Sequence, residues 1–114
     1  MLTIETLKAY GANTGEGVAR CLNNEGFYLN LVKTVPNDTS IASMRDAIAA
    51  NDLDTAFESA HALKGVLGNL SLTPLLQPVS EITEFLRARK EMDYTPLLEE
   101  LQQQFDALVE LCKE

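Results

Sequence analysis

The stretch that decides the fold is DTAFESAHALKGVLGNL, residues 54–70. Wound as an α-helix at about 100° per residue, it places five apolar side chains on one stripe, at steps of four, three, four and three residues: Ala56, Ala60, Leu63, Leu67 and Leu70. Such a stripe is typical of a helix that faces the core of a helical bundle. Asp54 is a suitable N-cap residue. The sequence therefore predicts a helix from about Asp54 to Leu70 with one buried face.

His61 is the only histidine of the chain and lies on the other side of this predicted helix. Its side chain points roughly 140° away from the centre of the apolar stripe, toward solvent. Lys64, Gly65 and Gly68 follow at i+3, i+4 and i+7, spacings that bring side chains together on one helix face. Each glycine in a helix interior costs about 1 kcal/mol relative to alanine. We interpret the two glycines as keeping the surface around the imidazole bare, so that a large object can approach the ring.

The segments before this helix predict short helices. We expect one from Leu2 to Tyr10, closed by Gly11, and a second around residues 17–23. Phe27, Leu31 and Val35 form a third apolar stripe that must stop near Pro36, because the residue before a proline disfavours the α region.

Three longer helices complete the prediction. Ser40 caps one that ends at Asn51-Asp52, and Thr73-Pro74 and Thr95-Pro96 each open another with a cap residue followed by proline. Pro78 is expected to kink the helix that it enters or to delay its start. The predicted core positions of the three helices are Ile41, Met44, Ala47 and Ile48; Leu75, Val79, Ile82 and Leu86; and Leu98, Leu101, Phe105, Leu108 and Cys112. Together these elements predict an all-α fold, an antiparallel up-down four-helix bundle with short additional N-terminal helices across one end, in a single domain over residues 1–114.

Composition and charge limit the classes of function. The chain has 114 residues, of which 46% are hydrophobic and 23% charged, typical of a globular domain. Nine Lys and Arg against 17 Asp and Glu give a net charge of −8, which argues against binding to nucleic acid or to anionic lipid. We find no signal peptide and no apolar run of the length a membrane span needs, so we expect a cytoplasmic protein. Cys21 and Cys112 match no metal or redox spacing, and we interpret them as reduced thiols, with a disulfide or redox role as the minor alternative.

An exposed imidazole can bind a metal, act in acid–base catalysis or carry a covalent group. Metal binding needs several converging ligands, whereas the face around His61 offers only Lys64 and Glu58. Hydrolytic catalysis needs a nucleophile, a base and an orienting group in an enclosed pocket, which a convex helix face does not supply. Covalent carriage fits better, because a neutral imidazole attacks an activated phosphoryl group and the ammonium of Lys64 can neutralise the charge of the phosphoryl oxygens.

The residues that carry this chemistry also carry a family resemblance. The segment His61-Ala62-Leu63-Lys64-Gly65, with Leu70 and Leu75 continuing the pattern, resembles the His-x-Leu-Lys-Gly signature of histidine-containing phosphotransfer (HPt) domains. The similarity is strongest between Asp54 and Arg87 and extends more loosely over the whole chain. It implies a four-helix bundle whose histidine exchanges a phosphoryl group with the aspartate of response-regulator receiver domains, including those of hybrid histidine kinases.

The resemblance also implies roles for single residues. His61 would be phosphorylated, Lys64 would neighbour the phosphoryl group, and Gly65 and Gly68 would provide clearance. Thr83 takes the position of a glutamine that in some members bonds the other ring nitrogen of the histidine, a role for which threonine reaches less far. Arg87 takes the position of a basic residue that contacts the partner.

The expected protein is thus a monomeric phosphohistidine carrier without autonomous kinase activity and without a metal or cofactor of its own, since the Mg²⁺ of the exchange should lie in the receiver. Two alternatives stay open: a helical adaptor that binds signalling partners without phosphorylation, and a dimerisation module that pairs as histidine kinases do. Phe57 and Tyr28 are interpreted either as an apolar docking patch near His61 or as core residues.

Overall fold

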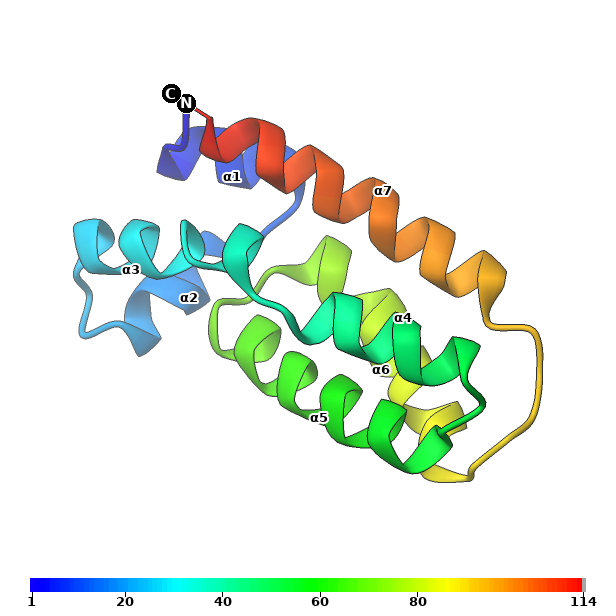
Figure 1. Cartoon of the computed structure of the whole chain (residues 1–114). Coiled ribbons are helices and arrows are strands. Elements are labelled where there is room, and N and C mark those ends of the chain that lie inside the picture. Colours follow the sequence, from blue (N-terminus) through cyan, green and yellow to red (C-terminus); the bar gives the residue numbers. More distant parts are fainter. Residues whose placement is uncertain (114) are drawn as a thin grey trace.

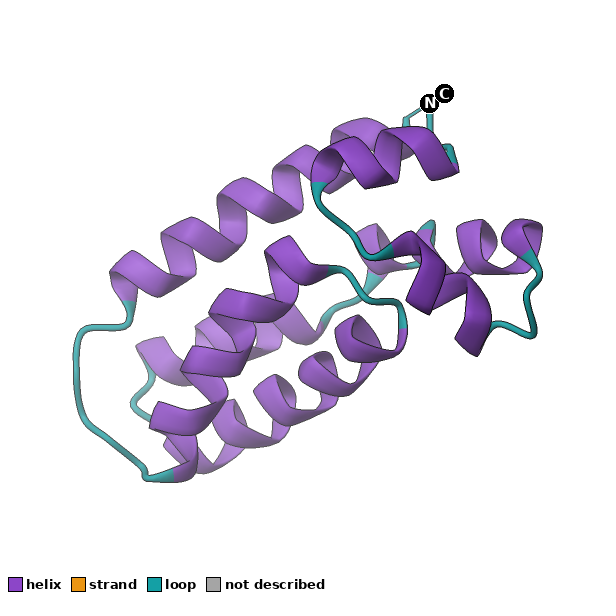
Figure 2. Cartoon of the chain, turned by 180° about the vertical axis from the view of Figure 1, so that it is seen from behind, coloured by secondary structure: helices purple, strands orange, loops and turns teal. Residues whose placement is uncertain are grey.

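The structure, a computed structural model, describes residues 1–113, and these form helices and turns without a strand (Figures 1 and 2). The elements are α1 (Ile4–Tyr10), α2 (Thr14–Arg20), α3 (Glu25–Val32), the 3₁₀ turn η1 (Val35–Asn37), α4 (Ser40–Ala49), α5 (Leu53–Asn69), α6 (Thr73–Arg87) and α7 (Thr95–Cys112). The predicted all-α fold is confirmed. None of the helices in the described part of the chain combines the length and apolar character that a membrane crossing requires.

The four C-terminal helices alternate in direction, and each packs against the next along the chain (Figure 1). α5 therefore lies between α4 and α6, with one face left for solvent. The short helices α1, α2 and α3 gather at the end of the molecule where α7 finishes (Figure 2). There the hydroxyl of Tyr10 donates a hydrogen bond to the carbonyl of Gln104, at 2.8 Å, and joins α1 to α7.

The apolar stripes predicted for α5 and α6 form the core. All five stripe residues of α5 are buried, as are Leu75, Val79, Ile82 and Leu86 of α6. In α4 the predicted positions are buried except for Ile48, which is partly exposed. In α7 only Leu101 and Leu108 are fully buried, and the other three predicted positions pack at the edge of the core.

The predicted starts of the four longer helices, α4–α7, were wrong by one or two residues. Asp52, not Asp54, caps α5: its carboxylate accepts hydrogen bonds from the backbone N–H of Thr55 (3.2 Å) and from the Thr55 hydroxyl (2.7 Å). These bonds hold the pKa of Asp52 below its usual value. Asp54 lies instead in the first turn, where it pairs with a distant arginine, Arg89.

The other three starts differ in the same way. Ser40 is the first residue of α4 rather than its cap, and its N–H donates to the Asp38 carboxylate at 2.7 Å. Thr73 and Thr95 are likewise the first helical residues, so that each proline occupies the second position. α6 begins at Thr73 and runs through the buried Pro78 without a break, so this proline does not delay the helix.

The N-terminal helices also differ from the prediction. α1 begins at Ile4, two residues later than predicted, and its C-cap is Gly11, as expected, in a left-handed backbone conformation with φ of 116°. α2 begins earlier than predicted, because Asn13 caps it, and it ends at Arg20. In α3 the buried side chains are Tyr28 and Val32, whereas Phe27 is 49% exposed and Leu31 is partly exposed; of the predicted stripe only Val35, in η1, is buried.

Both cysteines are free thiols, as expected: Cys21 is buried and Cys112 is partly buried. Burial raises the pKa of the Cys112 thiol, which disfavours the reactive thiolate.

Candidate functional site

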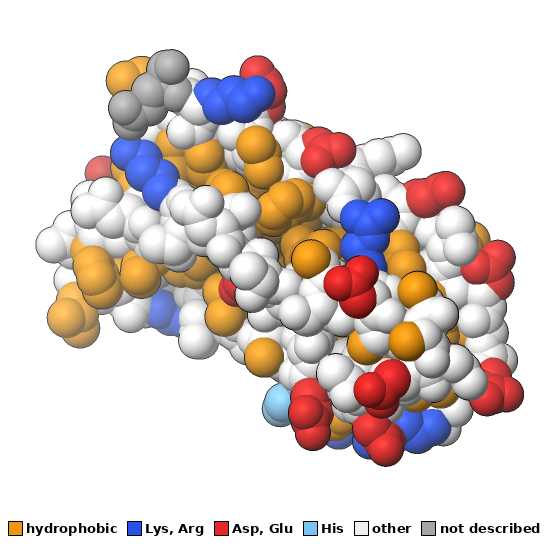
Figure 3. All heavy atoms as spheres, viewed as in Figure 1, with side chains coloured by type: hydrophobic (Ala, Val, Ile, Leu, Met, Phe, Trp, Pro, Cys, Tyr) orange, Lys and Arg blue, Asp and Glu red, His pale blue; other side chains and the backbone are white. Residues whose placement is uncertain are grey.

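The imidazole of His61 is exposed on the solvent face of α5, while the adjacent Ala60 and Leu63 are completely buried. It stands at the surface in the space-filling view, where histidine is pale blue (Figure 3). Within residues 1–113 no side chain or backbone group forms a hydrogen bond with either ring nitrogen. The nitrogens are therefore accessible to a group that arrives from outside.

The surface beyond the ring is bare, as the glycine spacing predicted. A Cβ atom added to Gly65 or Gly68 would meet no atom of this chain within 4 Å. The two glycines thus serve no close helix packing. Together with His61, Lys64, Arg20 and Asn69, they line a shallow hollow of about 400 Å³.

A stability measurement tests this clearance. We expect Gly65→Ala and Gly68→Ala each to raise the free energy of unfolding by about 1 kcal/mol, because alanine is the better helix former and fits the open space. Gly17→Ala is the matched contrast, since its Cβ would lie 2.4 Å from the Tyr28 ring and 2.9 Å from the Leu70 carbonyl. Crowding of this kind costs about 1–3 kcal/mol. In chemical denaturation the first two variants should gain stability and the third should lose it; a loss at Gly65 or Gly68 would show that these glycines support the fold.

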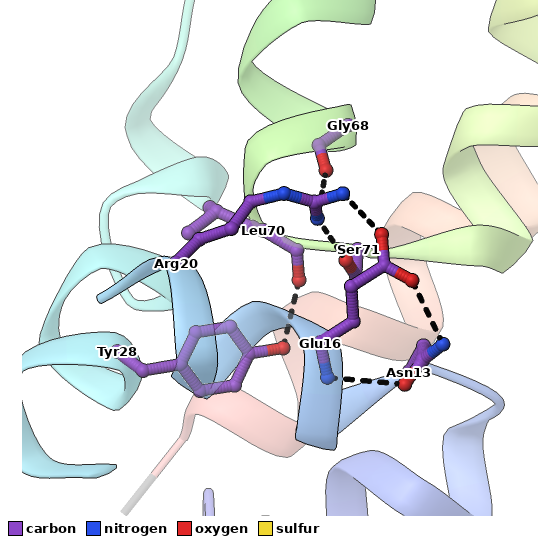
Figure 4. Close-up of polar contacts among 7 residues, drawn as sticks. All are labelled: Asn13, Glu16, Arg20, Tyr28, Gly68, Leu70 and Ser71. Carbon is purple, nitrogen blue, oxygen red and sulfur yellow. Dashed lines mark hydrogen bonds and ion pairs between the residues drawn. The ribbon is translucent and has the colours of Figure 1, made fainter. Parts of the chain in front are cut away.

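Two cations border the hollow. Lys64 is partly buried, and in the described part of the chain its ammonium group forms no ion pair. Arg20, from α2, donates hydrogen bonds through Nη1 to the carbonyl of Gly68 (2.9 Å) and to the Ser71 hydroxyl (2.6 Å), and it pairs with Glu16 (Figure 4). A positive rim of this kind suits a phosphoryl group or an acidic partner surface.

Sequence reasoning did not find Arg20. It lies 48 residues before Gly68, so no local spacing relates it to His61, and only the packing of α2 against the end of α5 brings it to the hollow. Its one sequence signal, a basic residue in the last turn of a short helix, is too common to indicate a site.

Phe57 stands beside the imidazole on the side away from the hollow. It precedes His61 by one helical turn, and the two rings are stacked with centroids 5.7 Å apart and planes inclined by 21°. The guanidinium groups of Arg87 and Arg89 lie over the same phenyl ring, at 5.2 and 4.8 Å from its centroid. The site therefore has a cationic hollow at one side of the imidazole and an aromatic ring at the other.

The chain matches one protein-family model, the Hpt domain, over residues 34–111. That match covers more than half of the chain and includes the whole of α5 and α6. The chain belongs to the Hpt domain family. It thus has a phosphotransfer role in two-component signalling, in which Hpt domains act as carriers rather than kinases. No curated protein and no solved structure matches the chain at a significant level.

Helices α1–α3 of this Hpt domain precede the matched residues, yet they complete the site. Asn13 donates its backbone N–H to the Ser71 carbonyl at 2.9 Å. The Tyr28 hydroxyl donates to the Leu70 carbonyl at 2.8 Å (Figure 4). With Arg20, which donates to the Gly68 carbonyl, they bind three carbonyls at and just beyond the C-terminal end of α5. Tyr28 is completely buried, and burial raises its pKa to about 12. It belongs to the core and is no part of a docking patch.

The structure does not bring Thr83 to His61, contrary to the orienting role that the resemblance implied. Thr83 is completely buried in α6, and its hydroxyl donates to the Val79 carbonyl one turn earlier, at 2.7 Å. A threonine hydroxyl is short enough to bond its own helix in this way. Across residues 1–113, no hydrogen bond connects it with the imidazole.

The remaining predicted residue, Arg87, lies at the surface of α6. It pairs with Glu84 at 3.1 Å while its guanidinium group covers Phe57. Arg87 thus lies on the same side of the Hpt domain as the His61 ring. Among the described residues, no group of three or more His, Cys, Asp or Glu side chains is arranged to bind a metal ion.

Proposed function

We propose that this Hpt domain is a phosphorelay intermediate, which accepts a phosphoryl group on His61 from the aspartate of one receiver domain and passes it to another. The observation that carries the proposal is the exposed imidazole on a helix face where Gly65 and Gly68 leave open space. A receiver must bring its own aspartate to within bonding distance of the ring, which requires that its surface lie flat against α5. Long side chains at these two positions would separate the surfaces.

One bond to phosphorus forms for each one that breaks during the transfer. The unprotonated nitrogen of His61 attacks the phosphorus, a P–N bond forms as the P–O bond of the aspartyl phosphate breaks, and the aspartate leaves as a carboxylate. The ammonium of Lys64, on the same face, balances negative charge on the phosphoryl oxygens. The Mg²⁺ that assists the exchange belongs to the receiver. Transfer to the second receiver is the reverse step: the P–N bond breaks, and the phosphoryl group passes from His61 to the second aspartate.

We further propose the form in which the carrier works. Its helices α4–α7 constitute an antiparallel four-helix bundle in a single domain over residues 1–114, supported by the alternating directions of the helices. It acts as a monomer in the cytoplasm, with response-regulator receivers and hybrid histidine kinases as partners. Light scattering tests the monomer: the mass of two chains would favour the dimerisation module.

The function is tested with receiver domains encoded near this chain, each labelled with radioactive phosphate on its aspartate and mixed with the Hpt domain. We expect the label to move to the Hpt domain within the lifetime of the phospho-receiver and to be labile in acid and stable in base, as phosphohistidine is. Labelled ATP alone should leave the protein unlabelled. If no cognate receiver transfers its label, the protein is a helical adaptor rather than a carrier.

A further inference from the structure

The His61 ring stacks on an aromatic side chain, Phe57, and within residues 1–113 neither ring nitrogen has a hydrogen-bond partner. A phosphoryl acceptor must present its nitrogen in line with the phosphorus, and a small misplacement lowers the rate strongly. Rotation of an imidazole about its Cβ–Cγ bond meets only a broad, shallow preference, so a second group usually fixes the ring, most often through the other nitrogen. Thr83 does not do this here: its hydroxyl donates to the Val79 carbonyl, and within residues 1–113 no hydrogen bond links it to the imidazole.

The geometry of Phe57 is suited to fixing the orientation of the imidazole. The centroid separation of 5.7 Å and the inclination of 21° describe an offset stack, the arrangement that aromatic pairs prefer. Since Phe57 precedes His61 by four residues on one helix, the stack depends on no long loop. A stack restricts the plane of the imidazole while it leaves both nitrogens unbonded.

The Phe57 ring is in turn contacted by two arginines, one at the end of α6 and one just after it. Arg89 bonds the Asp54 carboxylate through Nε at 2.6 Å and the Leu86 carbonyl through Nη1 at 2.7 Å, and its guanidinium group lies 4.8 Å from the Phe57 centroid. Cations over an aromatic face are attracted by its negative potential. Phe57 is only partly exposed, so its ring is also confined by the protein.

We propose that Phe57 is a positioning residue, which sets the orientation of the His61 ring by stacking and takes the place of a hydrogen bond to the second nitrogen. Arg87 and Arg89 fix the phenyl ring in turn. The proposal rests on the proposed function for its kinetic consequence, but the stacking of the two rings can be observed without any phosphoryl transfer.

The test compares Phe57→Leu, which keeps apolar bulk, with Phe57→Tyr, which keeps the ring. Phe27→Leu is the matched control, because Phe27 is an exposed phenylalanine on α3. In NMR spectra the ring current of Phe57 should displace the His61 ring protons, and we expect that displacement to disappear in Phe57→Leu and to persist in the tyrosine variant and in the control.

In transfer assays, Phe57→Leu should lower the rate at saturating phospho-receiver by about two- to tenfold, the range that corresponds to the strength of an aromatic pair. The receiver concentration for half-maximal rate should stay unchanged, and Phe57→Tyr should restore the rate. Unchanged His61 ring protons in Phe57→Leu would overturn the proposal, and so would an effect confined to the half-maximal concentration, which would make Phe57 a docking residue. If the wild-type protein accepts no phosphoryl group, the proposed function fails, while the NMR comparison still decides whether the Phe57 and His61 rings stack in solution.

Discussion

His61→Gln should abolish phosphoryl transfer, with a fall of at least about 10³-fold in rate. An amide nitrogen has no available lone pair for attack on phosphorus, so the variant lacks the only nucleophile of the proposed step. The fold should be unaffected, because His61 is exposed and has no hydrogen-bond partner in the described part of the chain. Losing the stack with Phe57 should lower the free energy of unfolding by no more than about 1.5 kcal/mol. The measurement is radiolabel on the protein after incubation with a phospho-receiver.

The matched control is Glu99→Gln, an exposed position on α7, which introduces the same side chain and should leave transfer unchanged. Circular dichroism and thermal unfolding verify that both variants are folded. Label that remains on His61→Gln would place the phosphoryl group on another side chain. Its stability in acid and base would then identify the kind of bond, and the carrier proposal for His61 would be wrong.

The features that could be predicted from sequence are those that depend on the residues of a single helix. The buried stripe of α5 and the exposure of His61 follow from the period of the α-helix, and both agree with the structure. Helix starts are less secure, because several residues compete to cap them. Asp52 and Asp54 are equally good caps by type, and the choice depends on Thr55 nearby and on Arg89, 35 residues after Asp54.

Features that depend on packing between distant segments could not be predicted. Phe27 and Tyr28 are adjacent aromatic residues, and helical period alone favoured Phe27. The buried carbonyl of Leu70 requires a donor, which the hydroxyl of Tyr28 supplies and phenylalanine lacks. Arg20 and Arg89 escaped notice for the same reason, and so did the contact of Arg87 with Phe57, since these contacts cross between helices.

The glycines show how one residue type serves opposite purposes. In the sequence Gly17, Gly65 and Gly68 all read as weak points of a helix. In the structure Gly17 lies against Tyr28 and leaves no room for a side chain, whereas Gly65 and Gly68 face open space. The first is required by the fold, and the other two reduce helix stability without a benefit to packing. A cost of that kind is expected where a surface must serve function.

Gly68→Arg should therefore slow phosphoryl transfer strongly while it leaves the fold intact. Its Cβ would meet no atom within 4 Å, and arginine is a better helix former than glycine, so we expect the free energy of unfolding to be unchanged or slightly higher. The added side chain would fill the hollow that His61, Lys64 and Arg20 line and hold a receiver away from the ring. A displacement of about 1 Å costs on the order of 10²-fold in rate, so transfer should fall by at least about that factor.

Two variants isolate the cause of this loss. Gly68→Ala adds only a methyl group, and we expect it to keep most of the transfer rate, because the partner surface is displaced far less than by arginine. Ala107→Arg, at an exposed position of α7, adds the same charge and length outside the hollow and should transfer normally. If Gly68→Arg transferred as fast as the wild type, the open surface around His61 would not be where receivers dock. If Ala107→Arg were equally slow, the loss would come from added positive charge rather than from lost clearance.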